Sequence, residues 1–212
     1  FIRKSLMKRT QVLLFSASIS NKTIKQANTI TYNPVIYELS KENKELIPKT
    51  IKHIFIISDR RERIETLRKI AKAVNSDKTM IFINTKYDLE ESLQKLQYHN
   101  YNVAALAGNI DKQSKKKAVE DFQNGRLQYL LATDVAARGL QIDHVSTVIN
   151  VNLPEEPTEY LHRAGRCGRN NEQGLCISII TENELNKIKK YQKAFNINIV
   201  QKRLYNGKIV SK

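Results

Sequence analysis

The chain has 212 residues, of which 41% are hydrophobic and 27% charged, and its formal net charge is +15. This mix is typical of a globular protein and excludes wholesale disorder. No apolar run approaches the roughly 18 residues that a membrane-spanning helix needs, so we expect no membrane partner. The two cysteines, Cys167 and Cys176, lack the spacing of a zinc site or a disulfide framework, which favours a cytoplasmic protein. The basic excess indicates a polyanionic partner, with nucleic acid ahead of membrane.

The first forty residues differ in character from the rest. The chain begins at Phe1 rather than Met, and soon after come a short strand-like run, Val12–Phe15, and a polar helix-like stretch from Asn21 to Thr29. The segment 41–50 is polar and charged and contains Pro48, which is typical of a linker. We therefore expect residues 1–40 to be the remnant of a preceding domain, 41–50 to be the linker, and 51–212 to be a second domain.

From residue 51 onward, expected strands and helices alternate. The strands are short β-branched runs at 51–57, 79–83, 103–106, 127–132, 145–151, 175–180 and 197–200. The helices are expected at 60–74, around 89–96, at 112–122 and 157–162, and from a Thr181–Glu184 capping box to about Phe195. This order predicts an α/β fold with an open, mostly parallel sheet and helices on both faces. After the last strand we expect only a short basic tail with Lys202, Arg203, Lys208 and Lys212.

Sheets of this kind bind ligands at the carboxyl ends of their strands. Small polar residues follow three of the expected strands: Thr85, then Gly108 and Asn109, then Thr133 and Asp134. Such residues let a phosphate backbone approach and offer it donors, although strand-to-helix turns use the same residues as caps. Because all of these residues are expected at one edge of the sheet, the pattern favours a binding rim over simple helix caps. Four lysines beside the Gly108 turn either add to it or form a solvated helix face: Lys112, Lys115, Lys116 and Lys117.

The sharpest pattern is His162-Arg-Ala-Gly-Arg-Cys-Gly-Arg169. Its arginines recur at every third residue, and its glycines would each cost a helix ~1 kcal/mol relative to Ala. Guanidinium groups stay charged and match phosphate oxygens with two parallel hydrogen bonds. The pattern therefore predicts phosphate binding rather than a merely basic surface.

Four segments, in this order, resemble motifs of the DEAD-box RNA helicases: Phe15–Ser18, Ile81–Thr85, Ala132–Leu140 and His162–Arg169. The resemblance covers nearly the whole chain. It implies that residues 1–40 are the tail of a first RecA-like domain and that the chain from about Ile47 is the second one. It also implies an ATP-dependent RNA helicase whose partners are RNA and its own N-terminal domain, with ATP and Mg²⁺ held mainly by that domain. The many Lys, Asn and Ile residues hint at a bacterial source.

The resemblance also implies roles for individual residues. Arg166 and Arg169 would reach the ATP γ-phosphate and stabilise its charge as arginine fingers. Nucleotide contacts are expected from Gly139, Gln141 and Asp143. RNA contacts are expected from Thr85, Gly108, Asn109, Gln113, Lys116, Thr133 and Asp134. Coupling between the domains is expected from Ser16, Ser18, Arg138, His162 and Arg163, and no metal site is expected in this chain.

Three positions depart from the family pattern. Gln141 stands where an Asp usually contacts the ribose, which predicts weaker nucleotide binding; Lys116 replaces a common Arg, and Ser18 a common Thr. The chain also contains no Gly-x-x-x-x-Gly-Lys-Ser/Thr and no Asp-Glu-Ala-Asp sequence. We therefore expect this chain alone to be inactive as an ATPase.

Two other interpretations remain open. Gly165-Arg-Cys-Gly168 matches the Gly-x-x-Gly clamp of KH domains, which would make the chain a stand-alone, non-catalytic RNA-binding module. That clamp needs neither Arg169 nor Thr133-Asp134, whereas a helicase cleft needs all of them. The third interpretation is a basic α/β protein, associated with ribosomes, that carries no site at these residues.

Overall fold

The computed structural model describes residues 10–15, 21–37, 47–107, 110–140, 142, 144–169 and 172–211. The chain divides into two compact units, residues 1–43 and 44–212. In the first unit, helix α2 spans Asn21–Asn28 where a helix was expected. Residues 10–15 form no strand, because a strand needs a partner for its backbone groups and no other described residue of this unit is in a strand. Phe15 is accordingly 89% exposed.

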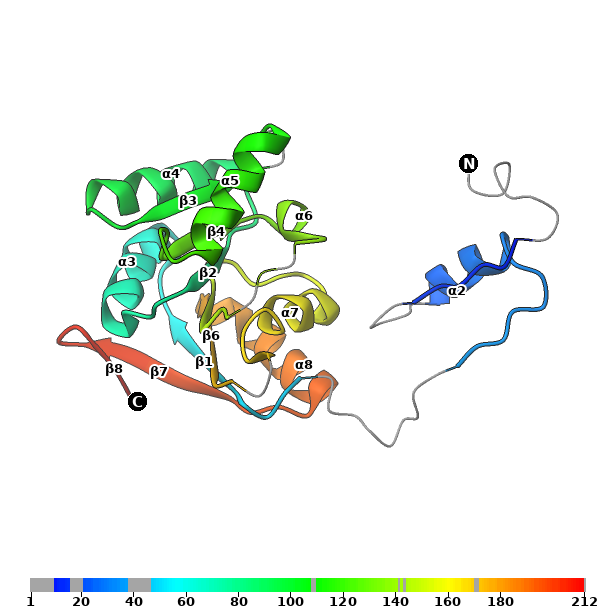
Figure 1. The fold of residues 1–212 in the computed structure, drawn as a ribbon. Coiled ribbons are helices and arrows are strands. Elements are labelled where there is room, and N and C mark those ends of the chain that lie inside the picture. The colour runs from blue at the N-terminus through cyan, green and yellow to red at the C-terminus, as the bar shows by residue number, and fades with distance from the viewer. Residues whose placement is uncertain are drawn as a thin grey trace. The chain divides into compact units, whose positions relative to one another are not determined.

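The second unit contains an eight-stranded sheet and its helices (Figure 1). The strands are β1 (Ile51–Ile57), β2 (Thr79–Phe82), β3 (Val103–Leu106), β4 (Tyr129–Ala132), β5 (Thr147–Asn150), β6 (Gly174–Ile180), β7 (Ile199–Tyr205) and β8 (Lys208–Ser211). The helices are α3 (Arg63–Val74), α4 (Lys86–Tyr98), α5 (Lys112–Gln123), α6 (Asp134–Ala137), α7 (Pro157–Ala164) and α8 (Leu185–Phe195), with 3₁₀ turns at Arg60–Glu62 and Glu182–Glu184.

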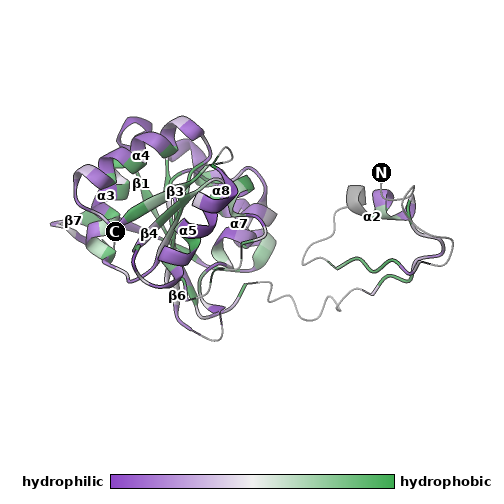
Figure 2. Ribbon diagram, turned by 45° about the horizontal axis from the view of Figure 1, so that its top comes forward, coloured by the Kyte–Doolittle hydropathy of each residue, from purple (hydrophilic) through white to green (hydrophobic). Residues whose placement is uncertain are grey.

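The strand order is β3-β4-β2-β5-β6-β1-β7-β8. Every neighbouring pair is parallel except β7 and β8, which are antiparallel. The carboxyl ends of β1 to β7 therefore lie along one edge of the sheet. The inner strands are mostly hydrophobic, whereas β7 and the helices also carry hydrophilic residues (Figure 2).

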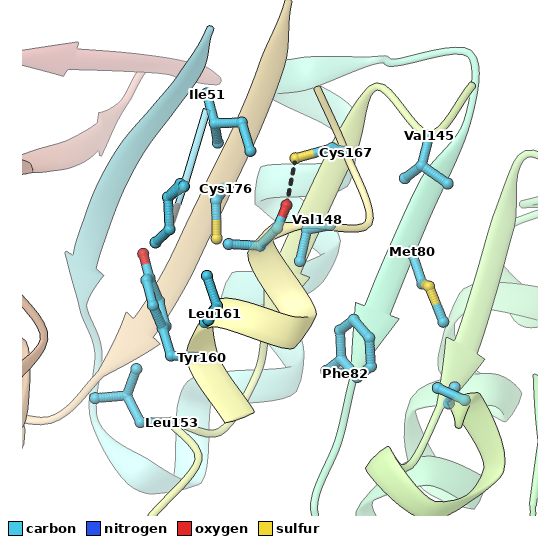
Figure 3. Close-up of a cluster of buried hydrophobic side chains, with 14 of the residues drawn as sticks. Ile51, Met80, Phe82, Val145, Val148, Leu153, Tyr160, Leu161, Cys167 and Cys176 are labelled. Atoms are coloured by element: carbon cyan, nitrogen blue, oxygen red, sulfur yellow. Dashed lines mark hydrogen bonds between the residues drawn. The ribbon is translucent and has the colours of Figure 1, made fainter. Parts of the chain in front are cut away.

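Two apolar clusters cover the two faces of the sheet. On one face, α3 and α4 contribute Leu67, Ile70, Leu89 and Leu96. On the other, α5 to α8 pack with residues such as Phe122, Tyr160 and Tyr191, and part of this cluster is drawn in Figure 3. The expected fold, an open and mostly parallel sheet with helices on both faces, is confirmed.

The structure contains the short helix α6 and the strand β8, which were not expected, and it shifts the ends of several expected elements. The helix expected at 60–74 begins with a 3₁₀ turn, so α3 starts only at Arg63. The expected basic tail is instead a β-hairpin, with Lys202 and Arg203 in β7 and Lys208 in β8; Lys212 lies outside the described residues. Its two turn residues, Asn206 and Gly207, both have positive φ (46° and 71°). An Asn-Gly pair favours this tight hairpin turn, and that signal was present in the sequence.

Candidate functional site

Three helices begin at the carboxyl ends of the neighbouring strands β3, β4 and β2, and we call the edge they share the strand-end rim. Each has a side-chain cap. The Thr85 hydroxyl accepts a hydrogen bond from the Asp88 amide at 3.1 Å, and the Thr133 hydroxyl accepts one from the Ala136 amide at 3.3 Å. Asp111 accepts from the Gln113 and Ser114 amides at 3.0 and 2.9 Å. Hydrogen bonds from Ser114, first through its side chain, hold the pKa of Asp111 below its ordinary value.

The two threonines keep a donor for an outside group. A hydroxyl that accepts a hydrogen bond from a helix amide still has its own proton to donate. Thr85 is exposed and Thr133 half-buried, so both protons can reach a phosphate oxygen at the rim. Cap and ligand contact are therefore compatible uses of the same side chain.

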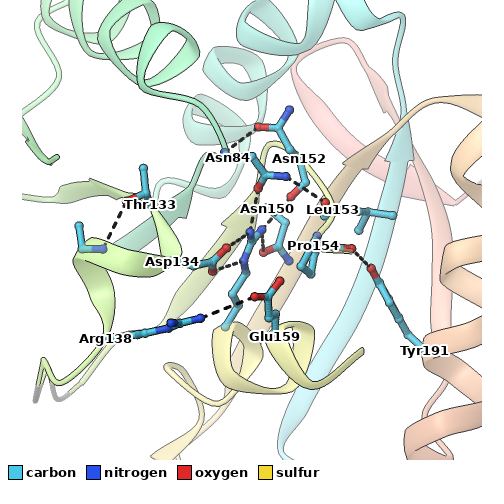
Figure 4. A network of polar contacts seen from close by, with 12 residues as sticks. Asn84, Thr133, Asp134, Arg138, Asn150, Asn152, Leu153, Pro154, Glu159 and Tyr191 are labelled. Atoms are coloured by element: carbon cyan, nitrogen blue, oxygen red, sulfur yellow. Dashed lines mark hydrogen bonds and ion pairs between the residues drawn. The ribbon is translucent and has the colours of Figure 1, made fainter. Parts of the chain in front are cut away.

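Arg163, on α7, is the centre of a polar network beside this rim. Its partners Asn84, Asp134, Asn150 and Asn152 are labelled in Figure 4. Its Nε and Nη2 donate to the two carboxylate oxygens of Asp134 at 2.7 and 2.5 Å. Nη1 donates to the Asn152 carbonyl at 2.7 Å and to the Asn150 side chain at 3.3 Å. Nη2 also donates to the Asn84 side chain at 2.8 Å. All five guanidinium donors thus have partners inside the same unit.

This arginine is buried, with an exposed fraction of 1%, and its guanidinium carbon lies 5.1 Å from the centre of the Phe82 ring. A buried cation needs a matched anion and complete hydrogen bonding, and Asp134 with the asparagines supplies both. The three asparagines were not among the expected site residues. Asn84 lies inside the Ile81–Thr85 motif, whereas the signal of Asn150 and Asn152 in the sequence is their position at the end of an apolar strand.

Arg166 and Arg169 lie on the segment after α7, and both donate to main-chain carbonyls of the stretch that follows α6. Arg166 Nη1 contacts the Leu140 oxygen at 2.6 Å. Arg169 Nη1 contacts the Ile142 oxygen at 3.4 Å, and its Nε contacts the Gly165 oxygen at 3.1 Å. Burial, and then the charge of Arg169, lowers the pKa of Arg166 from its ordinary value.

The three arginines therefore hold one stretch of chain, from Asp134 to Ile142, at successive points. Arg163 holds its start, whereas Arg166 and Arg169 hold two points near its end. The stretch directly follows Thr133, so the arginine segment and the strand-end rim are parts of one connected structure.

The remaining expected site residues lie around this structure. His162 is exposed, and so is Arg138, whose guanidinium is 3.7 Å from Glu159. Gly139 has φ of 73°, a conformation that favours glycine. Gln113 and Lys116 are exposed on α5, and Lys116 lies 3.7 Å from Glu120. Six expected residues lie outside the described ones: Ser16, Ser18, Gly108, Asn109, Gln141 and Asp143.

Behind the site, α7 is anchored by a second buried polar group. His53 Nδ1 and the Tyr160 hydroxyl are 2.8 Å apart. Burial lowers the pKa of His53 to about 4 and raises the pKa of Cys176 to about 11, which keeps both groups neutral near pH 7. The Cys167 thiol donates to the Ala164 carbonyl at the end of α7 (Figure 3). These contacts fix the helix from which the arginine segment projects.

The sequence and the structure both have relatives among known proteins. Residues 62–171 match the family described as the helicase conserved C-terminal domain. The chain is 32% identical over 208 residues to the DEAD-box ATP-dependent RNA helicase CshC of Bacillus cereus, covering 98% of this chain and 52% of that protein. It is 34% identical to the ATP-dependent RNA helicase DBP3 of Saccharomyces cerevisiae, over 86% of this chain and 36% of that one. The chain thus spans about half or less of the curated relatives it matches.

Among solved structures, the S. cerevisiae Dbp5 bound to RNA and ADP BeF3 superposes with a TM-score of 0.85 at 29% identity, covering 95% of this chain and 54% of that one. A DEAD box protein from Methanococcus jannaschii gives a TM-score of 0.67 at 27% identity, covering 96% of this chain and 54% of that one. The sheet is accordingly RecA-like. The chain belongs to the helicase conserved C-terminal domain family and carries the C-terminal helicase domain of a DEAD-box protein.

Proposed function

We propose that the intact protein is an ATP-dependent RNA helicase and that this chain is its C-terminal half. The chain would bind the RNA backbone at the strand-end rim and supply Arg166 and Arg169 to an ATP molecule held by the N-terminal domain. Hydrolysis would then be coupled to separation of an RNA duplex. The curated relatives, which are ATP-dependent RNA helicases about twice as long as this chain, support the proposal.

The observation that carries the proposal is the link between the arginine segment and the rim. Arg166 and Arg169 rest on carbonyls of the chain that directly follows Thr133. An RNA phosphate at Thr133 would act on the same stretch that positions the two guanidinium groups. RNA binding and phosphoryl transfer can therefore influence each other within this half of the protein.

ATP and Mg²⁺ would be held mainly by the N-terminal domain. The residues of this chain fit one part of such a site: two arginines, always charged, that can stabilise negative charge on a transferring phosphoryl group. Gly139, Gln141 and Asp143 would add nucleotide contacts, and Gln141 would bind a ribose hydroxyl without the charge of an aspartate. His162, Arg138, Ser16 and Ser18 would connect the two domains, with Arg163 acting indirectly by holding Asp134 in place.

The test is ATP hydrolysis, with and without single-stranded RNA, by this chain and by a longer version that includes the upstream half. We expect no turnover by the chain alone and RNA-stimulated turnover by the longer protein. Turnover by the chain alone would mean that the phosphates bind elsewhere and would overturn the assignment. RNA binding without ATPase activity in the longer protein would favour the stand-alone RNA-binding module instead.

A further inference from the structure

A cavity of about 720 Å³, which the proposed function does not use, lies at the carboxyl end of β1. It is bordered by residues 56–59, by α3, and by the hairpin from Arg203 to Gly207. The last residue of β7 that pairs with β1 is Lys202, opposite Ile56, whereas β7 continues to Tyr205. The hairpin therefore projects past the end of β1 and forms one wall of a hollow that we call the β1 notch.

The charges around the β1 notch are mostly positive and mostly uncompensated. Lys69 and Lys72 of α3 and Arg203 of β7 border it and are exposed. Among the ion pairs of the described part of the chain, none involves these three side chains. Arg68 also borders the notch but is engaged with Glu65, to which it donates at 2.5 and 3.1 Å. Within the described chain, three cations are thus outside any ion pair, beside the two exposed carboxylates of Asp59 and Glu62 that also border the notch.

An aromatic ring accompanies these cations. Tyr205 is 59% exposed, and the Arg203 guanidinium lies 5.6 Å from the centre of its ring. Because side chains alternate along a strand, these two residues share one face of β7, while Leu204 packs on the other with the core under α3. Beyond Lys202, the edge of β7 that faced β1 is unpaired with β1, and the notch is bordered there by side chains from both faces of β7. Lys208, opposite Tyr205 in the hairpin, adds an exposed cation on the same face.

From this combination we propose that the β1 notch is a second binding site for single-stranded RNA, separate from the strand-end rim. Phosphates would lie on Lys69, Lys72 and Arg203, and a base would stack on Tyr205. Cationic grooves with exposed aromatic rings bind single strands in this way, largely without regard to sequence. The proposal rests on the proposed function for the presence of RNA at the rim.

The geometry of the sheet allows one RNA strand to reach both places. The carboxyl ends of β1 and β2 lie on the same edge and are three strand positions apart in the order β2-β5-β6-β1. At ~4.8 Å per strand this is roughly 14 Å. Helices α3 and α4, which cover one face of the sheet, are joined by a Lys95–Glu65 ion pair at 3.1 Å. An RNA strand that leaves Thr85 along this edge would have to cover only this distance to reach the notch.

The acidic residues of the notch favour RNA over an acidic protein segment. Asp59 and Glu62 border the cavity and are exposed. RNA phosphates and peptide carboxylates would both be repelled by these two residues, but a peptide rich in carboxylates has no side-chain donors for them and no flat face for the Tyr205 ring. RNA presents 2′-hydroxyl donors to carboxylates and base faces to the ring.

The experiment compares RNA affinities of the full 212-residue chain and its variants by fluorescence anisotropy, using oligouridines of about 6 and about 20 nucleotides, a range that brackets typical single-strand site sizes. The notch variant combines Lys69→Glu, Lys72→Glu and Arg203→Glu. The matched control combines Lys189→Glu, Lys190→Glu and Lys193→Glu, three exposed lysines of α8. Each set changes the net charge equally and reverses one lysine in the last turn of a helix.

We expect the notch variant to lose most of its affinity for the long oligouridine and little for the short one. Its plot of log affinity against log salt concentration should flatten by about 2, since each phosphate contact to a single strand contributes about 0.7. Tyr205→Ala should weaken long-RNA binding roughly ten-fold, while Tyr205→Phe keeps the ring and the affinity. The α8 control should change neither slope nor length dependence.

A rim variant, Gln113→Ala with Lys116→Ala, separates this inference from the proposed function. Loss of affinity in the rim variant but not in the notch variant would overturn the notch and leave the proposed function standing. Loss in the notch variant alone would support the notch and count against the rim. No RNA binding by the unaltered chain would overturn both. Displacement of RNA by polyglutamate, with polyglutamate binding lost in the notch variant, would make the notch a protein-docking site and overturn the RNA proposal.

Discussion

The second unit carries two strongly basic segments that are built in opposite ways. On α5 the lysines project outward, Phe122 is the one buried residue of the helix, and Lys116 forms an ion pair with its helix neighbour Glu120. In the segment from Arg163 to Arg169, every arginine is bonded to its own unit. A flexible ammonium is a point charge, whereas a guanidinium is a rigid set of five donors. The first segment is therefore an adaptable source of charge, and the second is a fixed scaffold.

The largest effect should follow from breaking the scaffold where it would meet the nucleotide. In a version of the protein that includes the upstream half, Arg166→Ala and Arg169→Ala should each lower RNA-stimulated ATP turnover by at least ~10³-fold, the range of arginine-finger losses. RNA affinity without nucleotide should change little, because the rim is intact. The measurement is steady-state ATPase activity beside RNA binding. Unchanged turnover in both variants would place the phosphates away from these arginines.

Removing the buried arginine should affect folding rather than a single step of the reaction. Arg163→Ala leaves the Asp134 carboxylate and three asparagines without their donor, and deleting one partner of a buried ion pair costs about 3–5 kcal/mol. Urea unfolding of this chain should show the loss as a lower midpoint. Arg163→Lys keeps the charge but has three donors instead of five. Its urea midpoint should therefore lie between those of Arg163→Ala and the unaltered chain. The comparison variant on α5 is Lys116→Ala, whose free energy of unfolding should change by no more than about 0.5 kcal/mol.

The pH dependence of stability sharpens the same contrast, because α7 is anchored on neutral His53. Its pKa is lowered from 6.5 to about 4 in the folded unit, so between these values the unfolded chain binds a proton that the folded one does not. Stability is then fully present above pH 6.5 and falls as the pH drops toward 4, by about 3 kcal/mol from this residue. His53→Gln cannot titrate and should lose correspondingly less over that range. Parallel curves for the two proteins would contradict the burial of a neutral imidazole.

The smallest effect is expected on α5. Lys116→Ala should leave the urea midpoint unchanged and flatten the salt dependence of RNA binding by about 0.7, the contribution of one phosphate contact on a single strand. Anisotropy titrations at several salt concentrations measure it. A shifted unfolding midpoint would mean that the lysine has a structural role like that of the arginines.

The sequence predicted the inner strands of the sheet well because they are buried and appear as short apolar runs, whereas β8, which has no buried residue, was missed. Strand Val103–Leu106 and the Thr181–Glu184 capping box were located to the residue. Short elements were missed, such as α6, which has only four residues. Too few positions exist there for a helical period to be recognised.

The partners of the site residues were harder to predict than the residues themselves. Asp134 and Arg163 were singled out for different roles, yet they bond to each other across 29 positions of sequence. Nothing in the spacing of a motif reports such a pairing, which depends on how β4, β5 and α7 pack. The asparagines at 84, 150 and 152 were invisible as arginine ligands for the same reason.

The residues that lead into β1 are fastened to the arginine segment. Thr50 donates through its hydroxyl to the Gly168 carbonyl at 3.5 Å, and its own carbonyl accepts from the Gly174 amide at 3.1 Å. A Cβ atom on Gly168 would lie 2.5 Å from the Ile51 side chain, so that side chain packs directly against this glycine. A pull on the chain ahead of Thr50 would therefore act, through these hydrogen bonds, on both Gly168 and Gly174. The contacts that hold the start of β1 in the sheet therefore also hold the backbone next to Arg169.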